Sequence, residues 1–142
     1  MGYEIDLIIN DINDTSKCSN VITICEAHNC EHYYVSTEYD NQLKHKNLYT
    51  LINVTFNISV ADLAYFLVQI KKIKKVQFQT IYDTSNNKLI YGSQYYLTNL
   101  SNKPFCNEDY KHRRSTRSYS ENDVSILEIV CPRGIIFNDL KK

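Results

Sequence analysis

Four residues that can ligate a metal lie close together near the start of this sequence. Cys25, His28, Cys30 and His32 supply two thiols and two imidazoles, and proteins usually hold zinc with four sulfur or nitrogen ligands in a tetrahedron. Their spacing, C-x2-H-x-C-x-H, differs from the common zinc spacings. The alternative is a hairpin loop with exposed histidines and partly buried thiols. A zinc-stabilised hairpin is therefore one hypothesis, in a chain for which no other cofactor is expected.

A catalytic cysteine is a second interpretation of the same segment. A reactive thiol needs a lowered pKa, supplied by a neighbouring base or by a helix N-terminus. Glu26 and Glu31 would instead raise the pKa of a nearby thiol. The sequence also contains no P-loop, dinucleotide fingerprint, H-E-x-x-H motif, nucleophile elbow or kinase motif set. We therefore expect no catalytic residues and a non-enzymatic protein.

A basic segment could contact phosphate. Residues 111–117 contain three of the four arginines in the chain, and the guanidinium group suits phosphate recognition. Acidic residues on both sides cancel much of this charge, and the formal net charge of the chain is zero. Nucleic-acid binding is therefore an alternative hypothesis and not the favoured one. Its candidate contacts are Lys111, Arg113, Arg114 and Arg117, with Lys72 and Lys75 at the end of a predicted helix.

Tyrosine is abundant, with twelve residues and no tryptophan. Tyrosine packs well in strands and gives contact surfaces a large area at low entropic cost. Codon usage explains part of the excess, because Asn, Ile, Lys and Tyr are all frequent and all have AT-rich codons. This points to an AT-rich organism or virus. The candidate interaction residues are Tyr33, Tyr34, Tyr39, Tyr91, Tyr95 and Tyr96.

The elements that would position these residues are mainly strands. Alternating apolar and polar side chains predict them, and short connections favour antiparallel pairing. Residues 11–20 read as a polar connection, and residues 28–31 and 84–87 read as hairpin turns. The predicted strands are 3–9, 21–27, 32–39, 48–58, 76–83, 88–97 and 124–131.

One amphipathic helix is predicted, over residues 60–75. Ser59 is a favourable N-cap, and Asp62 places a negative charge in the first turn. After this start, apolar residues recur at helical spacing, and the predicted helix ends in a lysine-rich segment. The lysines complement the helix dipole, although a nuclear import signal is an alternative interpretation.

Together these patterns predict a single α+β domain over residues 1–142. We expect a mainly antiparallel sheet of about six or seven strands, with one central amphipathic helix packed on one face and a long polar loop at 99–123. One helix leaves much of such a sheet uncovered, which favours a protein-interaction or structural module that binds a protein partner or itself as a homo-oligomer.

The expected location is intracellular. No apolar run reaches the about 18 residues of a membrane span, and the first residues are acidic where a secretory signal would be basic. Five unevenly spaced cysteines favour reduced thiols. We therefore predict a cytoplasmic protein without a membrane partner, and a nuclear location stays open.

Overall fold

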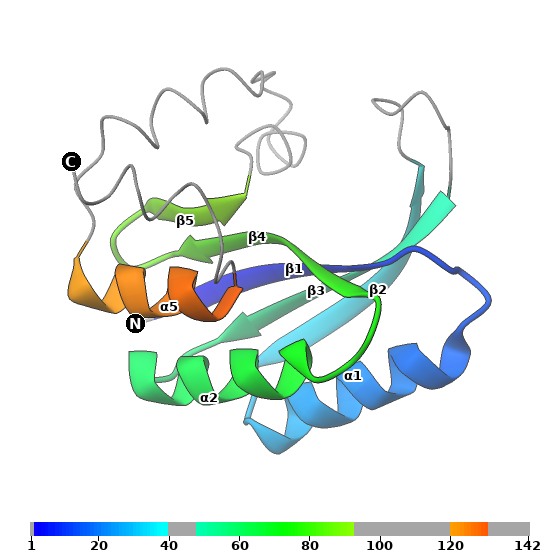
Figure 1. Ribbon diagram of the computed structural model, residues 1–142, viewed down its shortest axis with the longest axis horizontal. Coiled ribbons are helices and arrows are strands. Elements are labelled where there is room, and N and C mark those ends of the chain that lie inside the picture. Colours follow the sequence, from blue (N-terminus) through cyan, green and yellow to red (C-terminus); the bar gives the residue numbers. More distant parts are fainter. Residues whose placement is uncertain (1, 40–47, 93–119, 131–142) are drawn as a thin grey trace.

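The computed structural model describes residues 2–39, 48–92 and 120–130. These ranges form one sheet with helices beneath it (Figure 1). In chain order the elements are β1 (Tyr3–Ile9), α1 (Thr15–Ala27), β2 (His32–Tyr39), β3 (Leu48–Phe56), α2 (Val60–Lys71), β4 (Val76–Asp83), β5 (Lys88–Gly92) and α5 (Glu121–Val130).

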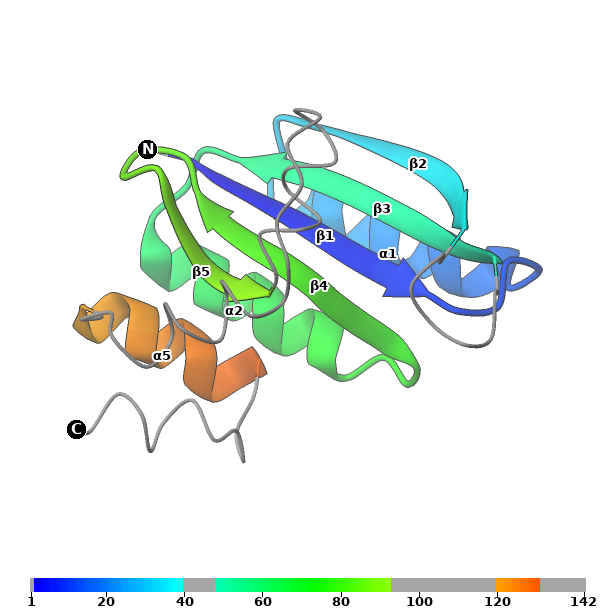
Figure 2. The same ribbon diagram turned by 90° about the horizontal axis from the view of Figure 1, so that it is seen from above.

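The sheet has the strand order β2-β3-β1-β4-β5, and every neighbouring pair is antiparallel. The first six elements follow the order β-α-β-β-α-β, with β3 inserted between β1 and β2 (Figure 2). This is the split βαβ topology called ferredoxin-like. β5 extends it by forming a hairpin with β4, and within the described residues β2 and β5 are the two edge strands.

The core lies between the sheet and the helices. Ile5 and Leu7 of β1 stand opposite Val54 and Ile52 of β3, and all four side chains are fully buried. Because side chains alternate along a strand, this register puts the apolar residues of both strands on the same face. From α2, Leu63, Phe66, Leu67 and Ile70 complete the cluster.

The described ranges contain five strands and three helices, so the prediction of six or seven strands with one helix is wrong. The α+β class and the antiparallel sheet are confirmed. Strands 3–9, 32–39 and 76–83 match the prediction, while the predicted strand 48–58 ends at Phe56 and the predicted helix 60–75 ends at Lys71. Residues 93–97 of a predicted strand, and most of the predicted loop, lie outside the described residues.

The first missed helix is α1, which replaces the predicted connection at 11–20 and the predicted strand at 21–27. Its run of Val21, Ile22, Thr23 and Ile24 has high strand propensity. Packing overrides this preference, because Val21 and Cys25 at helical spacing are both fully buried. The side chain of Asp14 caps the helix by accepting a hydrogen bond from the Lys17 N–H at 2.9 Å.

The second missed helix is α5, where the sequence predicts a strand at 124–131. Ile126, Leu127 and Val130 are buried along one side of it. Ser120 and Asp123 cap it reciprocally, since each backbone N–H donates to the side chain of the other at 3.3 Å. This capping-box pattern is the signal in the sequence that distinguishes the helix from a strand.

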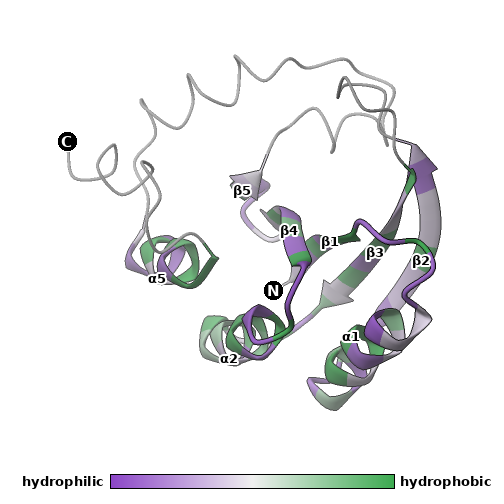
Figure 3. Ribbon diagram, turned by 45° about the vertical axis from the view of Figure 1, so that its right-hand side comes forward, coloured by the Kyte–Doolittle hydropathy of each residue, from purple (hydrophilic) through white to green (hydrophobic). Residues whose placement is uncertain are grey.

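All three helices lie on one side of the sheet, with α2 between α1 and α5 (Figure 3). The opposite side, here called the open face, carries no helix or strand from the described ranges (Figure 1). None of the helices in residues 2–39, 48–92 and 120–130 is long and apolar enough to cross a membrane.

Candidate functional site

The most exposed apolar strand in the described ranges is β2. Among the described strands it pairs only with β3, with Tyr33 opposite Val54 and Val35 opposite Ile52, and so it forms one edge of the described sheet. None of its eight residues is buried. Half of the exposed large apolar side chains in the described ranges belong to this strand: Tyr33 (39% exposed), Tyr34 (43%), Val35 (43%) and Tyr39 (45%). We call the outer side of His32–Tyr39 the open edge.

The composition of the open edge favours pairing with another strand. Tyr, Val and Thr dominate it, and these residues have high strand propensity. Proteins usually block an exposed edge with proline, lysine, a bulge or a covering element. β2 contains no proline, glycine or lysine, and its pairing with β3 has no register shift. Its two residues with ionisable imidazole or carboxyl groups, His32 and Glu38, stand near the two ends.

A shallow hollow adjoins the beginning of β2. Its volume is about 520 Å³. The chain reverses direction here through Asn29, whose φ of 60° lies in the left-handed region. The N–H of Cys30 then donates to the carbonyl of Cys25 at 3.1 Å, and that of Glu31 donates to the carbonyl of Thr55 at 2.8 Å. The hollow is lined by Glu26, Asn29, Cys30, Glu31, His32 and Tyr33.

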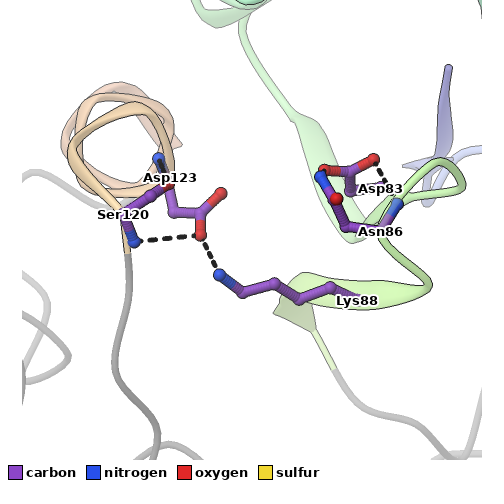
Figure 4. A network of polar contacts seen from close by, with 5 residues as sticks. All are labelled: Asp83, Asn86, Lys88, Ser120 and Asp123. Atoms are coloured by element: carbon purple, nitrogen blue, oxygen red, sulfur yellow. Dashed lines mark hydrogen bonds and ion pairs between the residues drawn. The ribbon is translucent and has the colours of Figure 1, made fainter. Parts of the chain in front are cut away.

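At the opposite edge of the described sheet, α5 packs beside β5. Lys88 of β5 forms an ion pair with Asp123 at the first turn of α5 (Figure 4). Asp83 organises the preceding turn by accepting hydrogen bonds from Ser85 and from Asn86. Burial raises the pKa of the Tyr3 hydroxyl beside this junction, and Asp83 and Asp123 raise it further. These polar groups are engaged with one another, so we interpret the junction as structural.

The open face has a polar, acidic centre. Asn53 donates from Nδ2 to Asp6 at 2.6 Å and to Glu4 at 2.9 Å, and Thr80 donates to Asp6 at 3.2 Å. Burial raises the pKa of the Asp6 carboxyl, the two hydrogen bonds oppose this, and Glu4 and Glu38 raise it further. Burial also raises the pKa of the Tyr34 hydroxyl, and Asp6, Glu4 and Glu38 raise it further. This charge is unfavourable for phosphate binding at the centre of the face.

The predicted zinc ligands lie in four different settings. Cys25 is fully buried in α1, and burial raises its pKa to about 12. His28 is the C-cap of α1, and the centroid of its ring lies 5.1 Å from that of the tilted Tyr65 ring. Cys30 is half-buried, and burial raises its pKa, while His32 is exposed and 3.3 Å from the Thr55 hydroxyl.

The hairpin expected to carry these ligands is replaced by the C-terminal end of α1. Across residues 2–39, 48–92 and 120–130, no group of three or more His, Cys, Asp or Glu is placed to hold a metal ion. The zinc site stays a prediction, because no measurement of metal content tests it.

The other predicted contacts are only partly placed by the structure. Lys72 and Lys75 are exposed after α2. Tyr33 and Tyr34 share β2, while Tyr91 is half-buried on β5 at the far edge. The remaining predicted residues lie outside the described ranges: Lys111, Arg113, Arg114, Arg117, Tyr95 and Tyr96.

Sequence reasoning missed Val35 and Leu48 as parts of the surface. Val35 is 43% exposed, and Leu48, opposite Tyr39 on β3, is 46% exposed. The available signal is the run Tyr33-Tyr34-Val35, which places large side chains on both faces of one strand. Such a run indicates either a buried strand or an exposed edge, and only the strand order distinguishes these two cases.

Comparison with known proteins supplies no relative from which to transfer a function. No protein-family model matches this sequence, and no curated protein matches it significantly. The ferredoxin-like topology hosts many unrelated functions, so it does not specify an activity. A functional hypothesis therefore depends on the chemistry of the open edge.

Proposed function

We propose that this protein is a non-enzymatic interaction module that binds an extended protein segment at the open edge. The observation that supports this is β2, a regular strand with high strand propensity and four large exposed side chains. An added strand would form backbone hydrogen bonds along β2, and the alternating side chains would provide specificity.

Burial of aromatic and aliphatic surface supplies the driving force for this proposal. Tyr33 and Val35 point toward the helix side of the edge, and Tyr34 points toward the open face. A partner strand would therefore cover apolar surface on both sides of the sheet. Removing such surface from water is worth roughly 25 cal/mol per Å² before the costs of association.

The acidic centre of the open face argues for protein and against nucleic acid as the partner at this site. A nucleic-acid platform on a sheet combines stacking aromatic residues with positive charge. Tyr34 is instead close to Asp6, Glu4 and Glu38. Phosphate contact would depend on Lys72, Lys75 and the basic residues at 111–117, and a titration at two salt concentrations tests it.

The direct test is a binding experiment with synthetic extended peptides and the isotope-labelled full chain. The panel includes a peptide with the sequence of residues 31–39 and its Val35→Pro version, which cannot complete the hydrogen-bond ladder. We expect the first peptide to shift and protect the β2 amides, and the proline peptide to have no effect.

Two chain variants sharpen this test. Val35→Lys places a charge on the open edge, while Val68→Lys makes the same change at an exposed position of α2. We expect only Val35→Lys to abolish peptide binding. Failure of the peptides to affect β2 in the unmodified chain would contradict the proposed function.

A further inference from the structure

We propose that the partner strand is β2 of a second copy of this chain, paired antiparallel about a two-fold axis at Val35. This inference rests on the proposed function and specifies its partner. The resulting dimer would join two five-stranded sheets edge to edge into one continuous sheet. Such a contact is isologous, so it closes at two copies.

The alternation of side-chain directions along β2 restricts where the two-fold axis can lie. Tyr33 and Val35 stand opposite Val54 and Ile52, which are buried on the helix side, so the odd-numbered residues of β2 face the helices. The even-numbered residues face the open side. Directly opposite residues of an antiparallel pair share a face. The two-fold axis must therefore pass through a residue and not between two residues.

Hydrogen-bonding complementarity selects Val35 as that residue. With the axis there, His32 stands opposite Glu38 of the second copy, and Tyr34 stands opposite Ser36. An axis at Tyr34 places His32 opposite Ser36 and moves Glu38 beyond the start of the partner strand. An axis at Ser36 places Glu38 opposite Tyr34 and moves His32 beyond its end. Only the axis at Val35 places the imidazole of His32 and the carboxylate of Glu38, both from β2, opposite each other.

The hollow beside β2 fits the same register. Tyr39 of the second copy falls opposite Glu31, one of the residues that line the hollow of about 520 Å³. Tyr39 is 45% exposed. In the dimer its ring would enter this hollow, and its hydroxyl could donate to the carboxylate of Glu26 or Glu31. The two-fold axis creates this contact twice.

No described helix obstructs the pairing. α1, the helix nearest to β2, lies beneath the sheet and inside the line of this strand (Figure 2). A contact of one strand per copy is smaller than the roughly 800 Å² per partner of a typical stable complex. We therefore expect a dimer that dissociates on dilution.

An experiment that exchanges residues 32 and 38, measured by sedimentation velocity, tests this register. The full chain is measured over a roughly hundredfold range of concentration, together with His32→Glu and the double variant His32→Glu/Glu38→His. His32→Glu places two glutamates opposite each other at both ends of the interface and should weaken the dimer about tenfold. The double variant restores opposite partners and should recover most of that loss.

Controls separate pairing from folding. Residues 32 and 38 lie near opposite ends of the same strand, so recovery by the double variant requires contact between two copies. Ala61→Glu adds a negative charge at an exposed position of α2 and should leave the dimer unchanged. Circular dichroism checks that each variant is folded, and Val35→Lys provides a second disruption that keeps both His32 and Glu38.

The outcomes distinguish this inference from the proposed function. A dimer that His32→Glu weakens and the double variant restores supports the two-fold register. A chain that stays monomeric, but whose β2 amides respond to the 31–39 peptide, overturns the dimer and keeps the proposed function. A monomer without peptide binding overturns both. A dimer that neither His32→Glu nor Val35→Lys weakens uses another surface and overturns the inference.

Discussion

The two edges of the sheet are built differently. β5 has five residues, a register shift in its pairing with β4, a glycine at its end and a helix packed beside it through the Lys88–Asp123 ion pair. β2 has eight residues and none of these features. Shortness, bulges and covering elements are the usual means of preventing unwanted strand pairing. One sheet therefore has one protected edge and one edge suited to pairing, which is why we assign the interaction to β2.

The largest loss of stability is expected from Gly92→Ala, at the end of β5. Gly92 has a φ of +103°, and an added Cβ would lie 2.1 Å from the carbonyl oxygen of Gln79. The backbone must shift to relieve this clash, so we expect a loss of about 2–4 kcal/mol in the free energy of unfolding. Urea denaturation measures it. An unchanged midpoint would show that the end of β5 does not depend on this close approach.

The next prediction concerns the helix that protects β5. Asp123→Ala removes the ion pair with Lys88 and one half of the capping box with Ser120. We expect a loss of about 1–3 kcal/mol in the free energy of unfolding and faster amide exchange in α5. Asp123→Asn is the matched control, because it keeps an oxygen for the cap and loses the charge. Equal stability of Asp123→Ala and the native chain would contradict a docking role for this pair.

A substitution at the open edge should change dimerisation and leave stability almost unchanged. Val35→Lys changes an exposed residue that no described strand covers on its outer side. We therefore expect a change of less than about 0.5 kcal/mol in stability, since exposed substitutions are usually tolerated, together with loss of dimerisation. Urea denaturation at low protein concentration and sedimentation velocity measure the two quantities. A large loss of stability in the monomer would indicate that β2 is part of the core.

The smallest expected effect on stability is that of Asp6 on the open face, and it depends on pH. The pKa of Asp6 is raised in the folded chain, chiefly by burial, so the protonated form favours folding. The contribution of the Asp6 carboxyl to the free energy of unfolding is fully present in acid. It decreases as the pH rises through the pKa of this group in the folded chain. Asp6→Asn keeps an oxygen for Asn53 and a polar partner for Thr80 but does not titrate. Its stability relative to the native chain should therefore increase from acid to neutral pH.

Urea denaturation of both proteins across this pH range measures the difference. A difference that is independent of pH, or that decreases toward neutral pH, would contradict a raised pKa for Asp6. Glu4→Gln is a useful comparison, because Glu4 contributes to raising the pKa of Asp6. That substitution should reduce the pH dependence without removing it.

Local patterns predicted some of these regions better than others. β1 and α2 could be predicted because the apolar residues of each follow one period. β4 was also predicted, although its register with β1 shifts between Asp6 and Leu7. α1 and α5 were predicted wrongly, since both contain β-branched residues that favour strands when taken alone, and the Ser120–Asp123 capping-box pattern is the signal that identifies α5. Their helical form depends on burial against the sheet.

The open edge depends on information that no local pattern contains. The sequence indicates that residues 32–39 form a strand and that tyrosines mark a contact surface. Whether this strand is central or at an edge depends on the insertion of β3 between β1 and β2, which is a long-range feature. The same alternation of apolar residues is compatible with either position, so the site could be proposed only with the strand order known.

Amide hydrogen exchange at two protein concentrations tests the central claim most directly. We expect the outward-facing amides of β2 to exchange rapidly in dilute protein and to become protected at high concentration, while the amides of β5 exchange at the same rate at both concentrations. Unchanged, rapid exchange of β2 at a concentration where sedimentation shows a dimer would contradict the claim that β2 is the edge at which two copies pair.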